Sequence, residues 1–198
     1  MLLFLTGVLL AGWLFMPWRH VGETALLSMS RRLPAPASLT YSTVGNARNG
    51  FVINNLAIRN LMGMVDVYFS TLTVVPAVAG SLLGMAPSGH VAFTGAVIGD
   101  VAVTPLRSIP GVAPGNGRVV VSAGRQGVFL DNLRSDGELS TSGSLLIDQS
   151  GRIAWADVAM DVRSSAFEEN LSVIGGVTGL PFQREGPGRW SLRRARGS

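Results

Sequence analysis

The chain has 198 residues, which is enough for a single domain of common size. It contains no cysteine, so disulfides, thiolate metal sites and cysteine nucleophiles are all excluded. Hydrophobic residues make up 47% of the chain and charged residues 14%, and there are 25 glycines, a composition typical of a folded, turn-rich protein. The formal net charge is only +4, and we expect no nucleic-acid partner.

The first hydrophobic run covers residues 2–18 and contains no charged residue. Its length is about that of a helix crossing the hydrocarbon core of a bilayer. Trp13 and Trp18 are suited to the membrane interface, and Pro17 falls at the end of the run, where a helix break costs little. We therefore expect a transmembrane anchor over residues 1–19. The residues expected to form this membrane anchor are Leu2, Leu3, Phe4, Leu5, Leu9, Leu10, Trp13, Leu14, Phe15 and Trp18.

Two other interpretations of this run are weaker. A cleaved signal peptide would need a basic segment before a shorter apolar core, but no arginine precedes the run. Large residues also follow Ala11 and Gly12, where a cleavage site would lie. A buried core helix would need a polar face, which the run lacks.

The orientation of the anchor depends on two opposing observations. Arg19, Arg31 and Arg32 follow the run, so the positive-inside rule alone would leave the rest of the chain in the cytoplasm. The composition of the rest of the chain is instead that of a β-rich envelope domain. We follow the composition and expect a C-terminal domain in the periplasm.

Residues 20–36 are expected to form a juxtamembrane helix and linker. Apolar residues recur at helical spacing from Ala25 to Leu33, and the pattern stops before Pro34. The helix could lie near the membrane, with Arg31 and Arg32 placed to meet lipid headgroups. Alternatively, it could pack on the domain that follows, and the sequence does not separate the two interpretations.

Residues 37–198 are expected to form one β-rich domain, because the apolar pattern changes to the alternation of strands. We predict a mainly β fold with about eight to ten strands, either a curved antiparallel sheet or a sandwich, with two short helices. A capping box at Ser165 and Glu168 predicts a helix that ends at Gly175. Residues 76–85 are expected to form helical turns, and 105–117 a loop. The expected strands are 39–44, 51–59, 65–75, 90–104, 118–123, 128–133, 138–148, 152–163 and 189–194.

Residues 50–56 and 127–133 share one pattern: Gly, three apolar residues, Asn or Asp, Asn, and Leu. We interpret each as a strand that begins at a glycine turn, with Asn55 or Asn132 allowing a bend at its far end. The motif is therefore expected to be structural. Its residues are Gly50, Asn54, Asn55, Leu56, Gly127, Asp131, Asn132 and Leu133.

The sequence offers little for catalysis. His20 and His90, the two histidines, have no metal-ligand partner at local spacing, and Asp131, Asp136 and Glu138 are expected to solvate a hairpin. Glycine-rich phosphate loops and the Gly-x-Ser-x-Gly motif are absent. We therefore predict no catalytic residue, no metal, no cofactor and no enzymatic activity.

Arginines are concentrated near the C-terminus. Such a cluster can meet phosphate, but we favour a solvated tail, because Trp190 is the one stacking ring nearby. The cluster consists of Arg184, Arg189, Arg193, Arg194 and Arg196.

Several segments together carry a resemblance to a known family. They are the end of the apolar run at residues 15–18, the heptad at 50–56, the segment 72–99, the hairpins at 127–148 and the strand at 189–192. With these segments the sequence resembles the type II secretion system protein N family, or GspN-like proteins, which is similar to membrane-anchored AsmA-like envelope proteins.

The resemblance implies a single-pass protein of the bacterial inner membrane with a periplasmic domain, acting as a non-enzymatic accessory or scaffold of a type II secretion system. The implied partners are the membrane and other secretion-system proteins. The alternative is an AsmA-like lipid-binding or lipid-transfer module, with phospholipid as a further partner. Residues 65–75 and 90–104 motivate this alternative, because both faces of these strands are partly apolar.

Overall fold

The computed structural model describes residues 16–33, 35–61, 63–77, 87–104, 107–150 and 152–195. Within these ranges the chain forms an eleven-stranded antiparallel sheet, a two-stranded hairpin and three helices. The helices are α2 (Trp18–Arg32), α4 (Ser165–Glu168) and α5 (Leu171–Thr178). The strands are β1 (Ser38–Thr40), β2 (Thr43–Ala47), β3 (Gly50–Leu61), β4 (Val65–Pro76), β5 (Ser88–Ile98), β6 (Val101–Thr104), β7 (Arg107–Ile109), β8 (Val112–Gly124), β9 (Gly127–Ser135), β10 (Leu139–Ile147), β11 (Ile153–Val162), β12 (Phe182–Gly186) and β13 (Arg189–Arg194).

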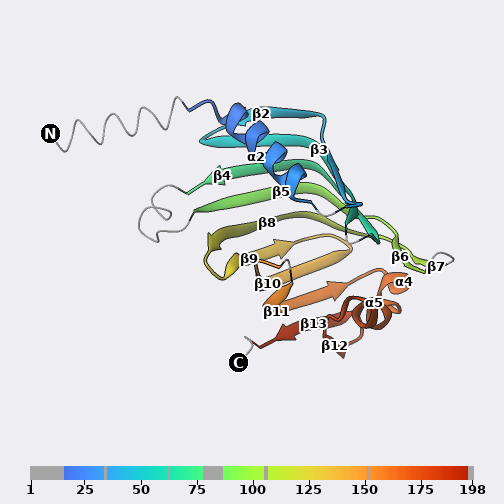
Figure 1. The fold of residues 1–198 in the computed structure, drawn as a ribbon. Coiled ribbons are helices and arrows are strands. Elements are labelled where there is room, and N and C mark those ends of the chain that lie inside the picture. Colours follow the sequence, from blue (N-terminus) through green and yellow to red (C-terminus); the bar gives the residue numbers. More distant parts are fainter. Residues whose placement is uncertain are drawn as a thin grey trace.

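The large sheet follows the chain almost in order. Its strand order is β1-β3-β4-β5-β8-β9-β10-β11-β13-β12, with β2 also paired to β3, and β6 and β7 form the separate hairpin. Figure 1 shows this progression from the N-terminal strands to the C-terminal hairpin. The described strands thus form a curved antiparallel sheet and not the two-layer sandwich that was the other expected architecture.

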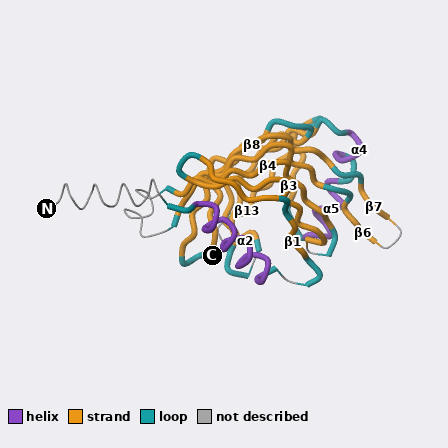
Figure 2. The backbone as a smooth tube through the Cα atoms, turned by 90° about the horizontal axis from the view of Figure 1, so that it is seen from above, coloured by secondary structure: helices purple, strands orange, loops and turns teal. Residues whose placement is uncertain are grey.

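The sheet has two unlike faces. Helices α2 and α5 lie on the same face, α2 over the N-terminal strands and α5 over the C-terminal ones (Figure 1). Seen from above, the strands bow around this side (Figure 2). We call it the helix-covered face, and the opposite one the open face.

Strand alternation explains why one face is covered. Along β11, Val158 and Met160 are buried, whereas Asp157 and Asp161, which flank this pair, are exposed. Since successive strand residues point to opposite faces, the apolar set faces the helices and the acidic set faces solvent.

Two hydrophobic clusters anchor the helices. The N-terminal cluster joins Trp18 and Leu26 of α2 to strands β2 and β3, and the C-terminal cluster joins Phe167 of α4 and Leu171 of α5 to the last strands. Burial of each large side chain contributes roughly 1.5–3 kcal/mol. The sheet residues of the N-terminal cluster are Val44, Phe51, Ile53 and Leu56. The strand residues of the C-terminal cluster are Ile109, Val112, Leu139, Ala156, Val158, Met160, Val162, Trp190 and Leu192.

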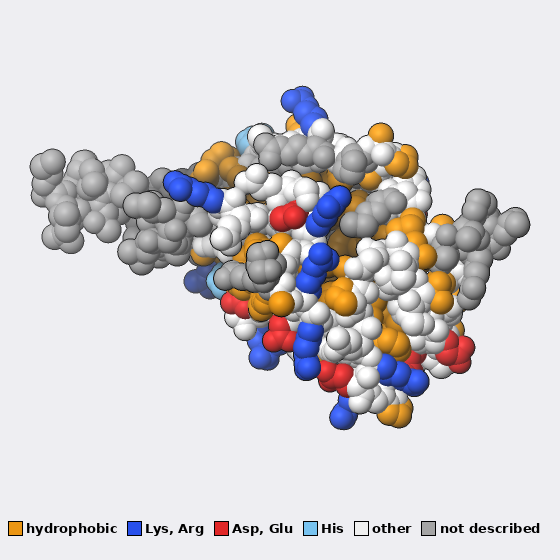
Figure 3. All heavy atoms as spheres, turned by 60° about the horizontal axis from the view of Figure 1, so that its bottom comes forward, with side chains coloured by type: hydrophobic (Ala, Val, Ile, Leu, Met, Phe, Trp, Pro, Cys, Tyr) orange, Lys and Arg blue, Asp and Glu red, His pale blue; other side chains and the backbone are white. Residues whose placement is uncertain are grey.

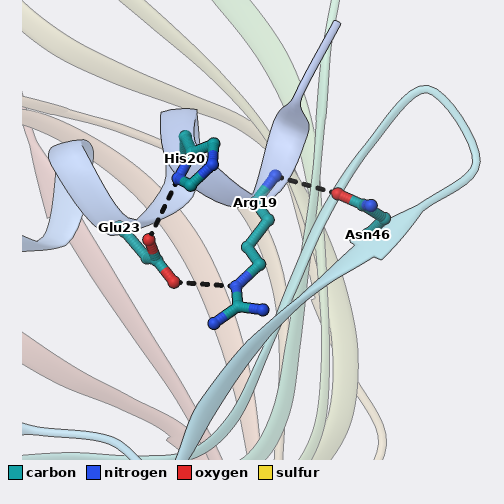
Figure 4. A network of polar contacts seen from close by, with 4 residues as sticks. All are labelled: Arg19, His20, Glu23 and Asn46. Atoms are coloured by element: carbon teal, nitrogen blue, oxygen red, sulfur yellow. Dashed lines mark hydrogen bonds and ion pairs between the residues drawn. The ribbon is translucent and has the colours of Figure 1, made fainter. Parts of the chain in front are cut away.

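A polar network fixes the start of α2 on the sheet (Figure 4). The backbone N–H of Arg19 donates to Oδ1 of Asn46 on β2 at 2.9 Å. Glu23 accepts from Nε of Arg19 at 2.9 Å and lies 3.4 Å from Nδ1 of His20. The hydrogen bond from Arg19 lowers the pKa of Glu23. Of the two expected positions for this helix, packing on the β-domain is the one observed.

Residues of the two heptads occupy equivalent places in β3 and β9. Gly50 and Gly127 each begin a strand beside a neighbouring backbone carbonyl, where a Cβ would clash. Asn55 and Asn132 both have a left-handed backbone, with φ of +50°. Asparagine adopts this conformation more readily than most residues, so it bends a strand at modest cost.

The expected strand at 65–75 matches β4, and the expected strand at 189–194 matches β13. The expected loop over 105–117 is wrong, because β7 and the first half of β8 lie there. One glycine of this segment, Gly115, has a φ of +74° and so fits inside a strand as an irregularity. Strand β12 was not expected, and the expected helical turns at 76–85 lie, after Ala77, outside the described residues.

The expected capping box is also wrong. Ser164, not Ser165, caps α4, with its side chain accepting from the backbone N–H of Phe167. Glu168 reaches the β12–β13 hairpin instead of the helix N-terminus. The helix predicted to end at Gly175 is two helices, and the second ends at Gly179, whose φ is +69°.

We predict that Gly22→Ala destabilises the fold. A Cβ at Gly22 would lie 2.7 Å from Phe51 Cδ2 and 2.9 Å from Val44 Cγ1, and both side chains are buried. Overpacking costs about 1–3 kcal/mol, which outweighs the gain of about 1 kcal/mol from replacing glycine within a helix. The measurement is the free energy of unfolding in urea.

The matched control is Gly176→Ala in α5, where a Cβ would meet nothing within 4 Å. This variant should be more stable by about 0.5–1 kcal/mol. Equal stabilisation by both substitutions would contradict the close packing of α2 on the sheet.

Candidate functional site

The residues named as chemical candidates by the sequence are dispersed. His20 lies on α2 and His90 on β5, and no group of three or more His, Asp or Glu residues among the described residues could hold a metal ion. Asp131 accepts from Oγ of Ser144 at 2.5 Å, and Asp136 accepts from the backbone N–H of Asn116 at 3.2 Å. These carboxylates therefore bond to neighbouring strands and are not arranged as a catalytic pair.

A groove crosses β4, β5, β8 and β9 on the open face, with a volume of about 460 Å³. Val75 of β4 and Val120 of β8 pair in register with His90 of β5 from either side. One row further along, Ala92 of β5 pairs with Arg118 of β8. The groove therefore has an apolar floor beside a basic side. Its volume is in the range of sites for small ligands.

Two arginines are brought together in this groove. Arg118 of β8 is the direct register partner of Arg134 of β9, and both line the groove. Residues opposite each other on one face of an antiparallel pair have Cβ atoms about 4.5–5.5 Å apart. Like charges at this separation destabilise the sheet, so fold stability does not explain the pair.

The left-handed Asn132 produces this pairing. Val120 pairs with Asp131, but Arg118 pairs with Arg134, so β9 has one extra residue between these two pairs. The same irregularity is found against β10. Such a bulge reverses the side to which the following residues point. Without it, Leu133 and not Arg134 would lie opposite Arg118.

Neither arginine forms an ion pair with the described carboxylates. The nearest carboxylate in the register, Asp131, accepts from the Ser144 hydroxyl and from the backbone N–H of Asn132. The described ion pairs involve other basic residues, those of α2 and the C-terminal strands. The pair in the groove is therefore left without a neutralising partner within the described structure.

The sequence pattern did not single out this site. A hairpin turn at Arg125 and Gln126 could have placed residues 118 and 134 within one position of register. The bulge that brings them into register was foreseen only as a bend at Asn132. Predicting the arginine pair from the sequence would have required both the position of the hairpin turn and the extra residue at Asn132.

The C-terminal arginines behave differently from expectation. They lie on the β12–β13 hairpin and not in a solvated tail, except for Arg196, which lies outside the described residues. Arg193 is 3.0 Å from Glu185 and 3.8 Å from Asp157, and Arg189 is 3.8 Å from Asp161. Figure 3, viewed from the side of these strands, shows basic and acidic side chains interspersed there. We call Asp157, Asp161, Glu185, Arg189 and Arg193 the charged strip.

Glu168 connects α4 to the same hairpin. Its Oε1 accepts from Nη2 of Arg184 and from the backbone N–H of Gly188, both at 2.9 Å, and from Nε1 of Trp190 at 3.4 Å. The backbone hydrogen bond from Gly188 is the main cause of the lowered pKa of Glu168. The carboxylate thus holds the helix against the C-terminal edge of the sheet.

Of the expected anchor residues, those from Leu2 to Phe15 lie outside the described residues. Trp18, the remaining one, begins α2 and is only 5% exposed in the N-terminal cluster. Within the described ranges, no helix is both long and apolar enough to cross a membrane.

We predict that Glu168→Gln lowers the melting temperature at neutral pH. Because the folded-state pKa lies below the ordinary value of 4.5, the carboxylate stabilises the fold fully above that pH. This contribution is lost as the pH falls through the lowered pKa. The difference between the wild type and the variant should therefore shrink on acidification, as measured by thermal unfolding against pH.

The control for this prediction is Glu169→Gln, which removes a neighbouring exposed carboxylate that makes none of the three bonds. It should follow the wild type at every pH. A Glu168→Gln variant that melts with the wild type at neutral pH would contradict the role of this contact.

Comparison with protein families identifies a family that the chain matches along almost its whole length. Residues 1–194 match the family model described as "Type II secretion system protein GspN-like, Synergistales". No curated protein and no solved structure matches the chain.

Proposed function

Because the chain belongs to the GspN-like family of type II secretion system proteins, we propose that it is an inner-membrane-anchored, non-enzymatic scaffold of that system. The match over residues 1–194 is the observation that carries this proposal. The family is associated with type II secretion and is not a known enzyme family. Other secretion-system proteins are the expected partners.

The anchor in this proposal is the apolar run at residues 2–18, and residues 37–198 are the periplasmic domain. The run reaches α2 through Met16 and Pro17, and α2 is fixed to the sheet by Trp18 and by the contact of Arg19 with Asn46. A short and fixed junction would hold the sheet close to the membrane surface. This geometry suits a protein that keeps partners near the inner membrane.

The charged strip is the partner-binding surface in this proposal. Its side chains are highly exposed, with 70% of Asp157 and of Asp161 accessible to solvent. Ion pairs this exposed contribute little to stability, commonly 0.2–1 kcal/mol or less, so the strip is free to exchange its contacts for those of a partner. The alternating charges of the strip favour a partner whose surface carries the complementary pattern of charges, and they increase the rate of its association.

The test is recovery of the affinity-tagged full-length protein from native membranes, followed by mass spectrometry. Secretion-system subunits should be recovered with the wild type. Asp161→Arg should reduce their recovery about tenfold, because it places a like charge against the partner.

Glu169→Arg on the α4–α5 side makes the same change in charge outside the strip and should leave recovery unchanged. The proposal is wrong if the wild type recovers no secretion subunit and deletion of its gene leaves secretion intact. If both variants reduce recovery equally, the strip is not the contact surface.

A second candidate function is the lipid-binding or lipid-transfer module. The observation that favours it is the open-face groove, in which Arg118 and Arg134 adjoin an apolar floor. Such a combination suits the headgroup and first methylenes of a phospholipid. Under this function, phospholipid should be enriched in the same preparations.

A further inference from the structure

We propose that Arg118 and Arg134 form a clamp for a phosphate group in the open-face groove. The two side chains come from directly paired positions on β8 and β9 and line the same groove of about 460 Å³. This site goes beyond the scaffold function and does not depend on it. For the second candidate function, lipid binding, the clamp specifies which chemical group of the ligand is bound. The clamp depends on that function only for where the phosphate comes from.

Charge is the first argument for an anion. Two guanidinium groups side by side repel each other, and among the described residues no carboxylate pairs with either. An anion between them would remove this repulsion and gain charge-assisted hydrogen bonds. The two positive charges are therefore not neutralised by the described carboxylates, and a bound anion would neutralise them.

Geometry favours phosphate over carboxylate. One guanidinium group can satisfy both oxygens of a carboxylate with two parallel hydrogen bonds. Two guanidinium groups present up to ten N–H donors, and the tetrahedral oxygens of a phosphate can accept from both at once. Phosphate can therefore accept more hydrogen bonds from two guanidinium groups than the carboxylate of an acidic side chain can.

The floor of the groove favours a phosphate that carries an apolar group. Val75 and Val120 lie in the row next to the arginines, on either side of His90, and Ala92 is paired with Arg118. An ester with a short hydrocarbon part would cover this floor, with a gain of roughly 25 cal/mol per Å² of apolar surface removed from water. Free phosphate would use only the clamp.

The bulge at Asn132 is the local cause of the paired arginines. Its left-handed backbone, with φ of +50°, places Arg134 beside Arg118 and turns Leu133 to the helix-covered face. A regular strand would have separated the two charges and been more favourable for the sheet. The strand thus departs from regular pairing at the point where this departure brings Arg134 beside Arg118.

The test is isothermal titration of the full-length protein in a maltoside detergent with three probes. They are inorganic phosphate, dihexanoyl phosphatidic acid below its micellar concentration, and a glutamate hexapeptide. The clamp variant is Arg118→Gln with Arg134→Gln, and the matched control is Arg48→Gln with Arg125→Gln, two exposed arginines in turns outside the groove. Thermal unfolding checks the fold of each.

A phosphate probe should bind the wild type and the control with the same affinity. Its affinity for the clamp variant should be lower by about tenfold or more. If phosphatidic acid binds more tightly than inorganic phosphate, the ligand is a lipid headgroup. If the two bind equally, the ligand is a free phosphate without an apolar part, and the clamp stands while the lipid-binding function fails.

Three results would overturn the clamp: no binding of either phosphate probe, an equal loss in the control, or tighter binding of the hexapeptide than of both phosphates. A clamp variant that does not fold would be replaced by Arg118→Lys with Arg134→Lys. This variant keeps the charge but loses the forked donors, and should still bind more weakly than the wild type.

Discussion

The structure depends on one constraint: a single sheet must bury one of its faces, and the helices of the described residues lie at its two ends. Trp18 and Leu26 bring α2 onto the first strands, and Phe167 and Leu171 bring α4 and α5 onto the last ones. Strand alternation then directs the apolar residues to that side all along the sheet. The opposite face carries the polar and charged residues, and both proposed binding surfaces lie there.

Strands with regular alternation were predictable from the sequence, as β4 and β13 show. The segment 105–117 was not, because its prolines and glycines are typical of a loop, whereas β8 takes Gly115 into the strand with a left-handed backbone. Glu168 was misplaced for a different reason. Its sequence spacing suits a capping box, but hydrogen bonds to Gly188 and Arg184, distant in sequence, determine its position.

The groove was beyond sequence reasoning because it depends on register. Single residues such as Arg118 and Arg134 carry no signal until the pairing of β8 with β9 is known. The heptad pattern located the bend at Asn132, but not the extra residue that turns Arg134 outward. The heptad thus predicted the bend at Asn132. The pairing of Arg134 with Arg118 that results from this bend is seen only in the structure.

We propose that this GspN-like chain is tethered to the inner membrane, with its sheet in the periplasm and the open face accessible. Because the chain has no cysteine, a single Ser142→Cys substitution on the exposed side of β10 gives a clean reporter. The decisive measurement is labelling by a membrane-impermeant maleimide in intact spheroplasts. Our account predicts labelling before lysis. Labelling only after lysis would place the sheet in the cytoplasm, as the arginines after the apolar run alone would suggest, and would contradict the account.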